Sequence, residues 1–349
     1  MSITVIKPGM LSTFQDLGRI GYQHQGIPVA GAMDPRAHRI ASLLVGNDPA
    51  RTASLEITLT GPTLRFDSAC CFALAGAQLG ASLNDQPIPN HRPLVARPGD
   101  VLGFGAPAQG VRAYLAVHGG FGIAPVMQSQ STYLRSGFGG LDGRALRKDD
   151  RIPLGSRLNV GADAADTLEM LAATLWAQRI YLPAAIVAPP RAALRVTPGR
   201  QWHLYTAQSQ ADFLDAAFTV SPQSDRMGYR LQGPALHMTA PAQMLSEAAC
   251  FGTVQVPGDG APIVLMADRQ TTGGYPKIAQ IAQVDLPHLA QTAPGEKLRF
   301  EMITLAEAQR LDAEREAAFS RLTDALAPVR ACYVQHFPAP ASFISPSTA

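Results

Sequence analysis

Most apolar segments of the chain alternate hydrophobic and polar positions, which is the pattern of β-strands with one buried face. In residues 54–59, leucine and isoleucine fall on one side, and Glu56 and Thr58 fall on the other. Similar short runs lie at 64–66, 70–75, 101–104 and 113–117, each bounded by Gly, Pro, Asn or Asp. The spacing of these runs predicts a barrel or a sandwich of many short strands.

Helical spacing is confined to a few stretches. Asp34 and the proline after it are typical of a helix start, and the apolar repeat that follows predicts a helix over 34–46. A short apolar stripe predicts a second helix over 163–178, and a shorter helix is expected near 211–217. A Thr-x-x-Glu capping box predicts a last, charged helix over 304–326. The expected fold class is therefore mainly β with a few short helices.

A cluster of prolines between 183 and 190 breaks the regular pattern, so we place a domain boundary there. We expect an N-terminal β lobe with a linker helix over 1–190 and a C-terminal β lobe with a terminal helix over 191–327. Residues 328–349 are expected to form a mobile tail, because the end of the chain is rich in Pro, Ser and Ala.

The composition excludes several classes of protein. Hydrophobic residues make up 46% and charged residues only 16% of the 349 residues, which excludes a mostly disordered chain and suggests a surface covered by a partner. The formal net charge of +2 gives no reason to expect nucleic acid. The four cysteines include no C-x-x-C pair, so we expect neither a disulfide framework nor a metal site. Neither a signal peptide nor a run of about 18 apolar residues is evident, so we expect a cytoplasmic protein without a membrane span.

None of the common catalytic motifs is present: the sequence has no G-x-x-x-x-G-K-[ST] phosphate loop, no H-E-x-x-H and no G-x-S-x-G. The strongest candidate for chemistry is the polar segment 268–277, which follows the apolar run 263–267. Two successive glycines in it would expose backbone N–H groups to an oxyanion or a phosphate. The alternative is a plain β-hairpin with a Gly-Gly primed turn. The candidate groups of this segment are Asp268, Arg269, Thr272, Gly273, Gly274, Tyr275 and Lys277.

Two further polar clusters are weaker candidates. Gln15, Asp16 and Arg19 lie in a glycine-rich segment where the arginine could bind a carboxylate, but a structural loop with an Arg19–Asp16 ion pair is the simpler interpretation. Arg226 and Arg230 lie four residues apart around a glycine. They could grip an anion together, or they could form ordinary ion pairs.

Read together, these segments resemble the biotin-dependent carboxyltransferase family, also called the allophanate hydrolase subunit 2 or KipA family. The resemblance covers about residues 3–310. It departs from the family pattern at 128–132, where Gln-Ser-Gln-Ser-Thr replaces a frequent Gly-Ser-Arg-Ser-Thr and so removes an arginine. The matching blocks are 7–9, 15–22, 31–34, 44–47, 55–62, 114–120, 224–231, 246–247, 255–257, 268–277, 290–291 and 294–295.

The resemblance implies a two-lobed, cyclophilin-like β-barrel architecture, which agrees with the strand-rich pattern. It also implies an enzyme subunit, because many members resemble the C subunit of the prokaryotic ATP-dependent 5-oxoprolinase, which opens 5-oxo-L-proline to L-glutamate. The expected partners are a subunit 1-like (KipI-type) protein and a LamB/YcsF-type third subunit. ATP would be used by the assembled enzyme, and we assign no cofactor to this chain itself.

The resemblance also implies catalytic and binding roles for the residues of the polar clusters. Arg269, Lys277 and the glycine amides would stabilise negative charge on the lactam oxygen. Asp268 or Glu247 would act as acid, base or orienting group. The expected substrate-binding residues are Gln15, Asp16, Arg19, Arg226, Arg230, Thr272, Gly273, Gly274 and Tyr275.

Two alternatives from the same family stay open. One is a component of a biotin-dependent carboxyltransferase of the urea carboxylase type. The sequence has no biotinyl-lysine A-M-K-M segment, so biotin would have to arrive on another chain. The other is a KipA-like regulatory protein that binds and antagonises a kinase inhibitor.

Overall fold

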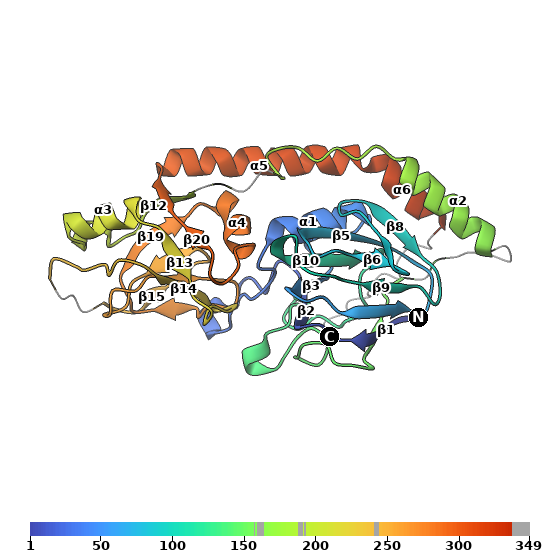
Figure 1. Cartoon of the computed structure of the whole chain (residues 1–349), viewed down its shortest axis with the longest axis horizontal. Coiled ribbons are helices and arrows are strands. Elements are labelled where there is room, and N and C mark those ends of the chain that lie inside the picture. Colours follow the sequence, from blue (N-terminus) through green and yellow to red (C-terminus); the bar gives the residue numbers. More distant parts are fainter. Residues whose placement is uncertain (157, 159–163, 188–190, 192, 241–243, 337–349) are drawn as a thin grey trace, which may run out of the picture.

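The computed structural model describes residues 1–349 except 157, 159–163, 188–190, 192, 241–243 and 337–349. Over this part, the chain is mainly β, as the sequence predicts, and its strands gather into two lobes with helices along one side (Figure 1). We call the β1–β11 part the N-terminal lobe and the β12–β21 part the C-terminal lobe. Among the described residues, we find no helix with the length and apolar character needed to cross a membrane.

The N-terminal lobe packs two mainly antiparallel sheets around an apolar core. The alternating runs predicted from the sequence form its central strands. The first sheet has the order β11 (Arg151–Pro153), β1 (Ser2–Lys7), β4 (Thr63–Phe66), β9 (Val101–Gly103), β6 (Ser82–Leu83) and β7 (Gln86–Pro87). The second has the order β2 (Leu11–Gln15), β3 (Ser54–Thr58), β10 (Gln109–Val117), β5 (Cys70–Gln78) and β8 (Pro93–Ala96).

The strand β3 differs from its sequence pattern, because both of its faces are buried. The alternation predicted a polar side open to water, yet Glu56 is only 1% exposed and Thr58 is 9% exposed. The apolar side faces the core between the two sheets, and the polar side faces the C-terminal lobe. A carboxylate in this position needs partners, and these define the site described below.

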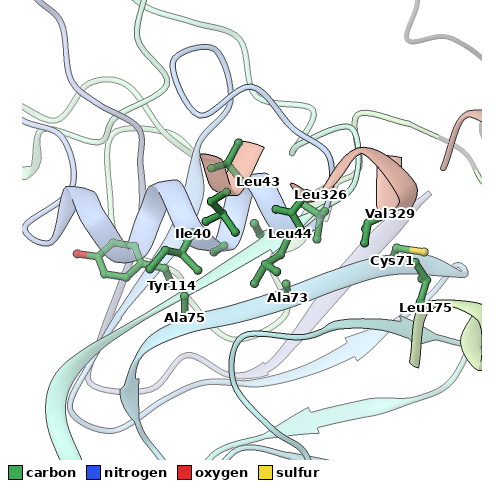
Figure 2. Close-up of a cluster of buried hydrophobic side chains, with 14 of the residues drawn as sticks. Ile40, Leu43, Leu44, Cys71, Ala73, Ala75, Tyr114, Leu175, Leu326 and Val329 are labelled. Carbon is green, nitrogen blue, oxygen red and sulfur yellow. The ribbon is translucent and has the colours of Figure 1, made fainter. Parts of the chain in front are cut away.

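A layer of helices covers the outer face of the second sheet. The helix α1 (Pro35–Leu44) begins where the sequence predicts, with the Asp34 side chain accepting a hydrogen bond from Ala37 N. Figure 2 shows Ile40 and Leu44 of this helix above β5, with Leu326 and Val329 closing the cluster from the chain's C-terminal helices. The helix α2 (Ala164–Ala177) joins the same core.

The C-terminal lobe is built on one eight-stranded sheet with a separate two-stranded ribbon. Among the strands in the described part of the chain, only β12 and β21 pair in parallel. The helices α3 (Ala207–Asp215) and α4 (Leu286–Ala290) flank the sheet, and the ribbon pairs β15 (Glu247–Ala248) with β18 (Thr272–Gly273). The sheet order is β20 (Lys297–Leu298), β13 (Phe218–Val220), β14 (Gly228–Gln232), β17 (Ile263–Leu265), β16 (Thr253–Gln255), β19 (Lys277–Ile281), β12 (Leu194–Pro198) and β21 (Phe300–Met302).

The long helix α5 (Leu305–Ala325) runs from the C-terminal lobe across to the N-terminal lobe (Figure 1). The predicted Thr304 cap is present, since Glu307 N donates to Thr304 Oγ1 at 3.1 Å, while the Glu307 carboxylate accepts from Arg310. The expectation of a mobile tail from residue 328 is wrong over its first part, because Ala327–His336 form the helix α6. Tyr333 is buried there and donates its hydroxyl to Leu44 O at 3.0 Å, so α6 closes the apolar core instead of trailing in solvent. The rest of the expected tail lies outside the described residues.

Candidate active site at the junction of the lobes

The two lobes meet at a buried arginine. Arg226 is 6% exposed, and its Nε and Nη2 each donate to one oxygen of Asp268 at 2.9 Å. Its Nη1 forms an ion pair with Glu56 of the N-terminal lobe, and Nη2 also donates to Gly31 O at 2.6 Å. The guanidinium therefore joins carboxylates from both lobes, an arrangement that its forked donors favour.

Strand pairing explains why residues far apart in sequence meet here. Arg226 lies just before β14 and Asp268 lies just after β17, and these two strands pair with Gly228 opposite Leu265. The backbone continues the ladder, because Asp268 N donates to Arg226 O at 2.8 Å. The predicted segments around 226 and 268 therefore form one site.

Glu56 is held by several donors besides Arg226. Its Oε2 accepts hydrogen bonds from Met33 N at 2.9 Å and from the Tyr114 hydroxyl at 2.7 Å. The same hydroxyl accepts a bond from Asp34 N at 2.7 Å. These contacts fix the start of α1 against the sheet, so the Glu56 carboxylate has a single well-defined position.

A second set of contacts docks the lobes beside this network. Arg112 Nη1 donates to the Tyr229 hydroxyl at 2.6 Å and to Ala290 O at 2.5 Å. The Gln291 Oε1 accepts from Val111 N and Arg112 N at 3.0 and 2.9 Å. A side chain at Gly110 would not fit, since its Cβ would lie 2.6 Å from this Gln291 oxygen. The relative position of the lobes is thus set by polar contacts as well as by packing.

The two carboxylates that share Arg226 differ in acidity. Burial acts to raise the pKa of Glu56, but Arg226, Arg112, Met33 N and the Tyr114 hydroxyl together lower it below its usual value. Burial raises the pKa of Asp268, and the favourable contact with Arg226 does not fully offset this effect. A pair of titratable groups whose environments push their pKa values apart is typical of an acid–base site, and Asp268 is the member suited to exchange a proton.

Asp268 and Arg226 line a cleft of about 530 Å³ between the lobes. The N-terminal lobe contributes Met10, Leu11 and Arg135 to its wall, and the volume is in the range of small-molecule sites. The cleft thus combines an apolar wall, a buried ion pair and a further cation, which suits a small substrate with polar groups.

The other residues of the predicted 268–277 segment do not line the 530 Å³ cleft. Lys277 Nζ lies 3.2 Å from Glu247 Oε2 and donates to Ala248 O at 2.7 Å, and Arg200 Nη1 bonds the other Glu247 oxygen at 2.9 Å. The hydrogen bond from Lys277 holds the pKa of Glu247 below its usual value. Lys277 and Glu247 are therefore brought together at the β15–β18 ribbon, whereas the 530 Å³ cleft is lined by Asp268.

The two glycines of the segment do not form a primed turn, because neither has the positive φ that such a turn requires. Gly273 belongs to β18, where a Cβ would lie 2.7 Å from the Gln255 amide nitrogen. That nitrogen is buried without a hydrogen-bond partner in the described part of the chain. Gly274 and its neighbours Thr272 and Tyr275 are exposed at the edge of the ribbon.

Arg269 has a structural environment that its sequence position did not predict. Its Nε donates to Ala249 O at 3.2 Å, and its guanidinium lies near the Phe251 ring, with a centroid distance of 5.9 Å. Burial lowers its pKa. The cation expected to face developing negative charge is therefore directed at backbone carbonyls, which fixes the segment after β15.

The N-terminal cluster forms a clamp on the loop at 126–131. Asp16 accepts hydrogen bonds from Ser129 Oγ at 2.7 Å and from Ser131 Oγ at 2.5 Å. Arg19 is buried and donates to Ser131 O, and its guanidinium lies 4.8 Å from the Phe138 ring centroid. Gln15 is fully buried and donates to Thr132 O at 3.1 Å. The predicted loop is therefore real, but the Arg19 fork bonds a carbonyl, and no ion pair joins it to Asp16 among the described residues.

Arg230 does not join Arg226, although the sequence suggested a shared anion grip. It lies on β14, where Tyr229 and Leu231 point inward, so Arg230 is exposed and absent from the cleft lining. Residues four apart on one strand would share a face, but Arg226 lies before β14 and turns toward Asp268, which separates the two arginines. The groups that sequence reasoning missed are Glu56, Arg112, Tyr114, Arg135 and Tyr229, and the only available signal was a charged residue inside an otherwise apolar strand.

Comparison with known proteins agrees with this architecture. A family model described as "Carboxyltransferase domain, subdomain A and B" matches residues 25–302. The chain is 41% identical to the C subunit of 5-oxoprolinase from Escherichia coli, covering 92% of this chain and 97% of the relative. It is 37% identical to the C subunit of 5-oxoprolinase from Haemophilus influenzae, covering 87% of this chain and 92% of the relative. Kluyveromyces lactis urea carboxylase superposes with a TM-score of 0.80 at 25% identity, over 92% of this chain but only 29% of that protein.

Proposed function

This chain belongs to the family of carboxyltransferase domains built from subdomains A and B, and we propose that it is the C subunit of a 5-oxoprolinase. The observation that carries the proposal is the similarity to two proteins of that name along nearly their whole length, at 41% and 37% identity. The enzyme would hydrolyse the lactam of 5-oxo-L-proline to L-glutamate together with partner subunits.

The chemistry asks for a proton-transferring group beside the lactam. A lactam carbonyl is a poor electrophile, so we propose that ATP activates its oxygen in the assembled enzyme. Asp268 then takes a proton from the water that attacks the activated carbonyl carbon, and this proton passes to the ring nitrogen as the C–N bond breaks. A second water releases phosphate from the resulting acyl phosphate. Burial raises the pKa of the Asp268 carboxyl above its usual value, which suits it to this proton exchange. Arg226 positions that carboxylate through two bonds of 2.9 Å, and Arg135 supplies a cation on the cleft wall for the substrate carboxylate.

This proposal gives a different role to the edge of the β15–β18 ribbon, which carries Lys277, Glu247 and the two glycines. Leu245 is 87% exposed and Tyr275 is 50% exposed, and both lie beside the β15–β18 ribbon. Exposed large apolar groups next to an ion pair are typical of a contact surface. We therefore propose that this edge meets a partner protein, which would bring Lys277 to a composite active site. The expected partners remain a KipI-type and a LamB/YcsF-type protein.

The test is reconstitution. The three proteins are co-expressed, the complex is purified, and ATP-dependent release of glutamate from 5-oxo-L-proline is compared with that of the two partners alone. The proposal predicts turnover only when this chain is present. Equal turnover without this chain, or none from a stable three-protein complex, would contradict it.

A second candidate function is carboxyl transfer from carboxybiotin, which the similarity to urea carboxylase at a TM-score of 0.80 favours. Biotin would then arrive on another chain. The same purified complex distinguishes the two, because carboxyl transfer would require a biotinylated carrier and would be abolished by avidin, whereas lactam hydrolysis would be insensitive to avidin.

A further inference from the structure

A second cleft lies between the lobes, where α1 and α4 face each other below α5 (Figure 1). It has a volume of about 650 Å³ and is lined by Arg36 of α1, His91 of the loop before β8 and His288 of α4. Neither Asp268 nor Arg226 lines it. The cleft is therefore a different feature from the candidate active site, although the two share wall residues such as Leu59 and Val111.

Three half-buried polar side chains of this cleft, those of Arg36, His91 and His288, have few partners within the described part of the chain. Among the described residues, no hydrogen bond reaches the imidazole of His91 or of His288. Arg36 is 17% exposed, and its only charged partner in that part of the chain is Asp34, at 3.5 Å. Asp34 is already engaged, since it caps α1 and accepts a bond from Gln291 Nε2 at 2.9 Å. The Arg36 donors are thus available to a ligand.

The backbone holds His91 in place for this purpose. Its φ of 62° lies in the left-handed region, an uncommon conformation for a residue with a side chain. His91 N donates to Leu74 O at 2.8 Å, and the Asn90 side chain donates to Ala77 O at 3.1 Å. Two bonds to β5 therefore fix a strained loop that directs an imidazole to the cleft.

The charge of the cleft favours an anion. Its lining includes Arg36, Arg191, Lys297 and Arg299, against the single carboxylate of Glu296. Of these cations, Arg191 is paired with Glu301 at 2.9 Å, and Arg299 donates to the backbone oxygen of Asp215. Burial and the nearby positive charge of Arg36 keep the pKa of both histidines below the usual value. A bound anion would offset the repulsion from Arg36. Cations and imidazoles around one cavity are the donors that oxyanions prefer.

We propose that the cleft formed by Arg36, His91 and His288 binds a small molecule with two or more phosphate or carboxylate oxyanion groups. The volume exceeds that of one phosphate and suits a ligand whose second anionic group contacts the exposed Lys297 of the lining. This site is independent of the proposed reaction, because it requires no partner protein and no turnover.

The test uses the purified full-length chain and two probes, pyrophosphate and glutarate, which separate phosphate from carboxylate recognition. Calorimetry should show saturable binding of at least one probe. Arg36→Ala should weaken that binding roughly 10- to 100-fold, as expected when a hydrogen bond to a charged group is lost. The matched control is Arg97→Ala, which removes an exposed cation outside the cleft and should leave binding unchanged.

A second readout separates a site from general charge attraction. In NMR spectra of the histidine ring protons, the bound probe should shift the His91 and His288 signals, identified with His91→Asn and His288→Asn, and leave exposed His24 unmoved. No saturable binding of either probe, or equal weakening by Arg36→Ala and Arg97→Ala, would overturn the proposal. If Arg36→Ala lowers the melting temperature, Arg36→Gln gives the same comparison with more of the side chain kept.

Discussion

Arg226 bonds both oxygens of Asp268 at 2.9 Å while its remaining donors reach Glu56 and Gly31 in the other lobe. One side chain therefore orients a candidate catalytic carboxylate and ties together the two halves of the fold. Stability and activity can therefore be tested separately. Substituting Arg226 tests the connection between the lobes, and substituting Asp268 neutralises the carboxylate while the cation stays in place.

Removing the Arg226 cation should unfold the chain more readily. Arg226→Met leaves Glu56 and Asp268 buried without their shared partner, which typically costs about 3–5 kcal/mol. Urea denaturation of the purified variant measures the change in the free energy of unfolding. Arg230→Met is the control, because this exposed arginine four residues further along the chain should change stability by no more than about 0.5 kcal/mol. Similar unfolding free energies for both variants would show that the network does not hold the lobes together.

Stability should fall in acid partly because of Glu56. The pKa of this carboxyl is lower in the folded chain than its usual value of 4.5, so its contribution is present above the usual value and is lost as pH falls through the folded value. Glu56→Gln should therefore flatten the dependence of the unfolding free energy on pH in the acid range below that usual value. The pKa of Asp268 is raised, so ionisation of this residue changes the unfolding free energy with pH in the opposite direction. Asp268→Asn should therefore not reproduce the flattening seen in Glu56→Gln. Parallel pH profiles for wild type and Glu56→Gln would contradict this account.

Arg269 and Lys277 should respond differently to truncation. Arg269→Ala removes a half-buried cation from backbone carbonyls and should lower the free energy of unfolding by about 1–3 kcal/mol. Lys277→Ala removes the Glu247 ion pair and the bond to Ala248 O, so it should lower the free energy of unfolding by about 1 kcal/mol. It should also lower turnover of the assembled enzyme by about 10²-fold or more, if Lys277 completes a composite site. Lys148→Ala, at an exposed position, serves as control. Wild-type turnover in Lys277→Ala would mean that the Lys277–Glu247 pair only shapes the ribbon.

The isolated chain should have no 5-oxoprolinase activity. Its sequence has no glycine-rich phosphate loop, and the exposed Leu245 and Tyr275 are expected to need a partner. The measurement is ATP-dependent glutamate release by the pure chain, with the co-purified complex as the positive control. Sustained turnover by the chain alone would disprove the expected division of the site between subunits.

Local signals in the sequence were sufficient for much of the fold. The Asp34–Pro35 start of α1 and the Thr304 cap of α5 depend only on residues within one turn, and both helices begin where they were predicted. The alternating runs form strands as predicted, because the twofold pattern also depends only on residues close together in the sequence. The helix α6 was missed because Tyr333 and its neighbours form a helix by packing on α1, a contact that no local pattern encodes.

The site was harder to predict because it depends on contacts between lobes. Glu56 looked like a solvent-facing strand residue, and only the C-terminal lobe turns it into a buried partner of Arg226. The crowded segment 268–277 looked like one site, but the strand end at Asp268 and the ribbon at Lys277 direct their side chains to different places. Sequence adjacency identified which residues were unusual, and the tertiary fold decided which of them meet.

The most direct test of the central claim is the turnover number of the reconstituted enzyme carrying Asp268→Asn. The amide keeps the size of the side chain and, through its oxygen, one of the two Arg226 bonds, but it cannot accept the proton, so kcat should fall by about 10²- to 10⁴-fold with the complex intact. Asp215→Asn, an exposed substitution in the same lobe, should keep wild-type turnover. A kcat for Asp268→Asn close to that of wild type, in a complex of normal size and stability, would contradict the assignment of the Arg226–Asp268 cleft as the active site.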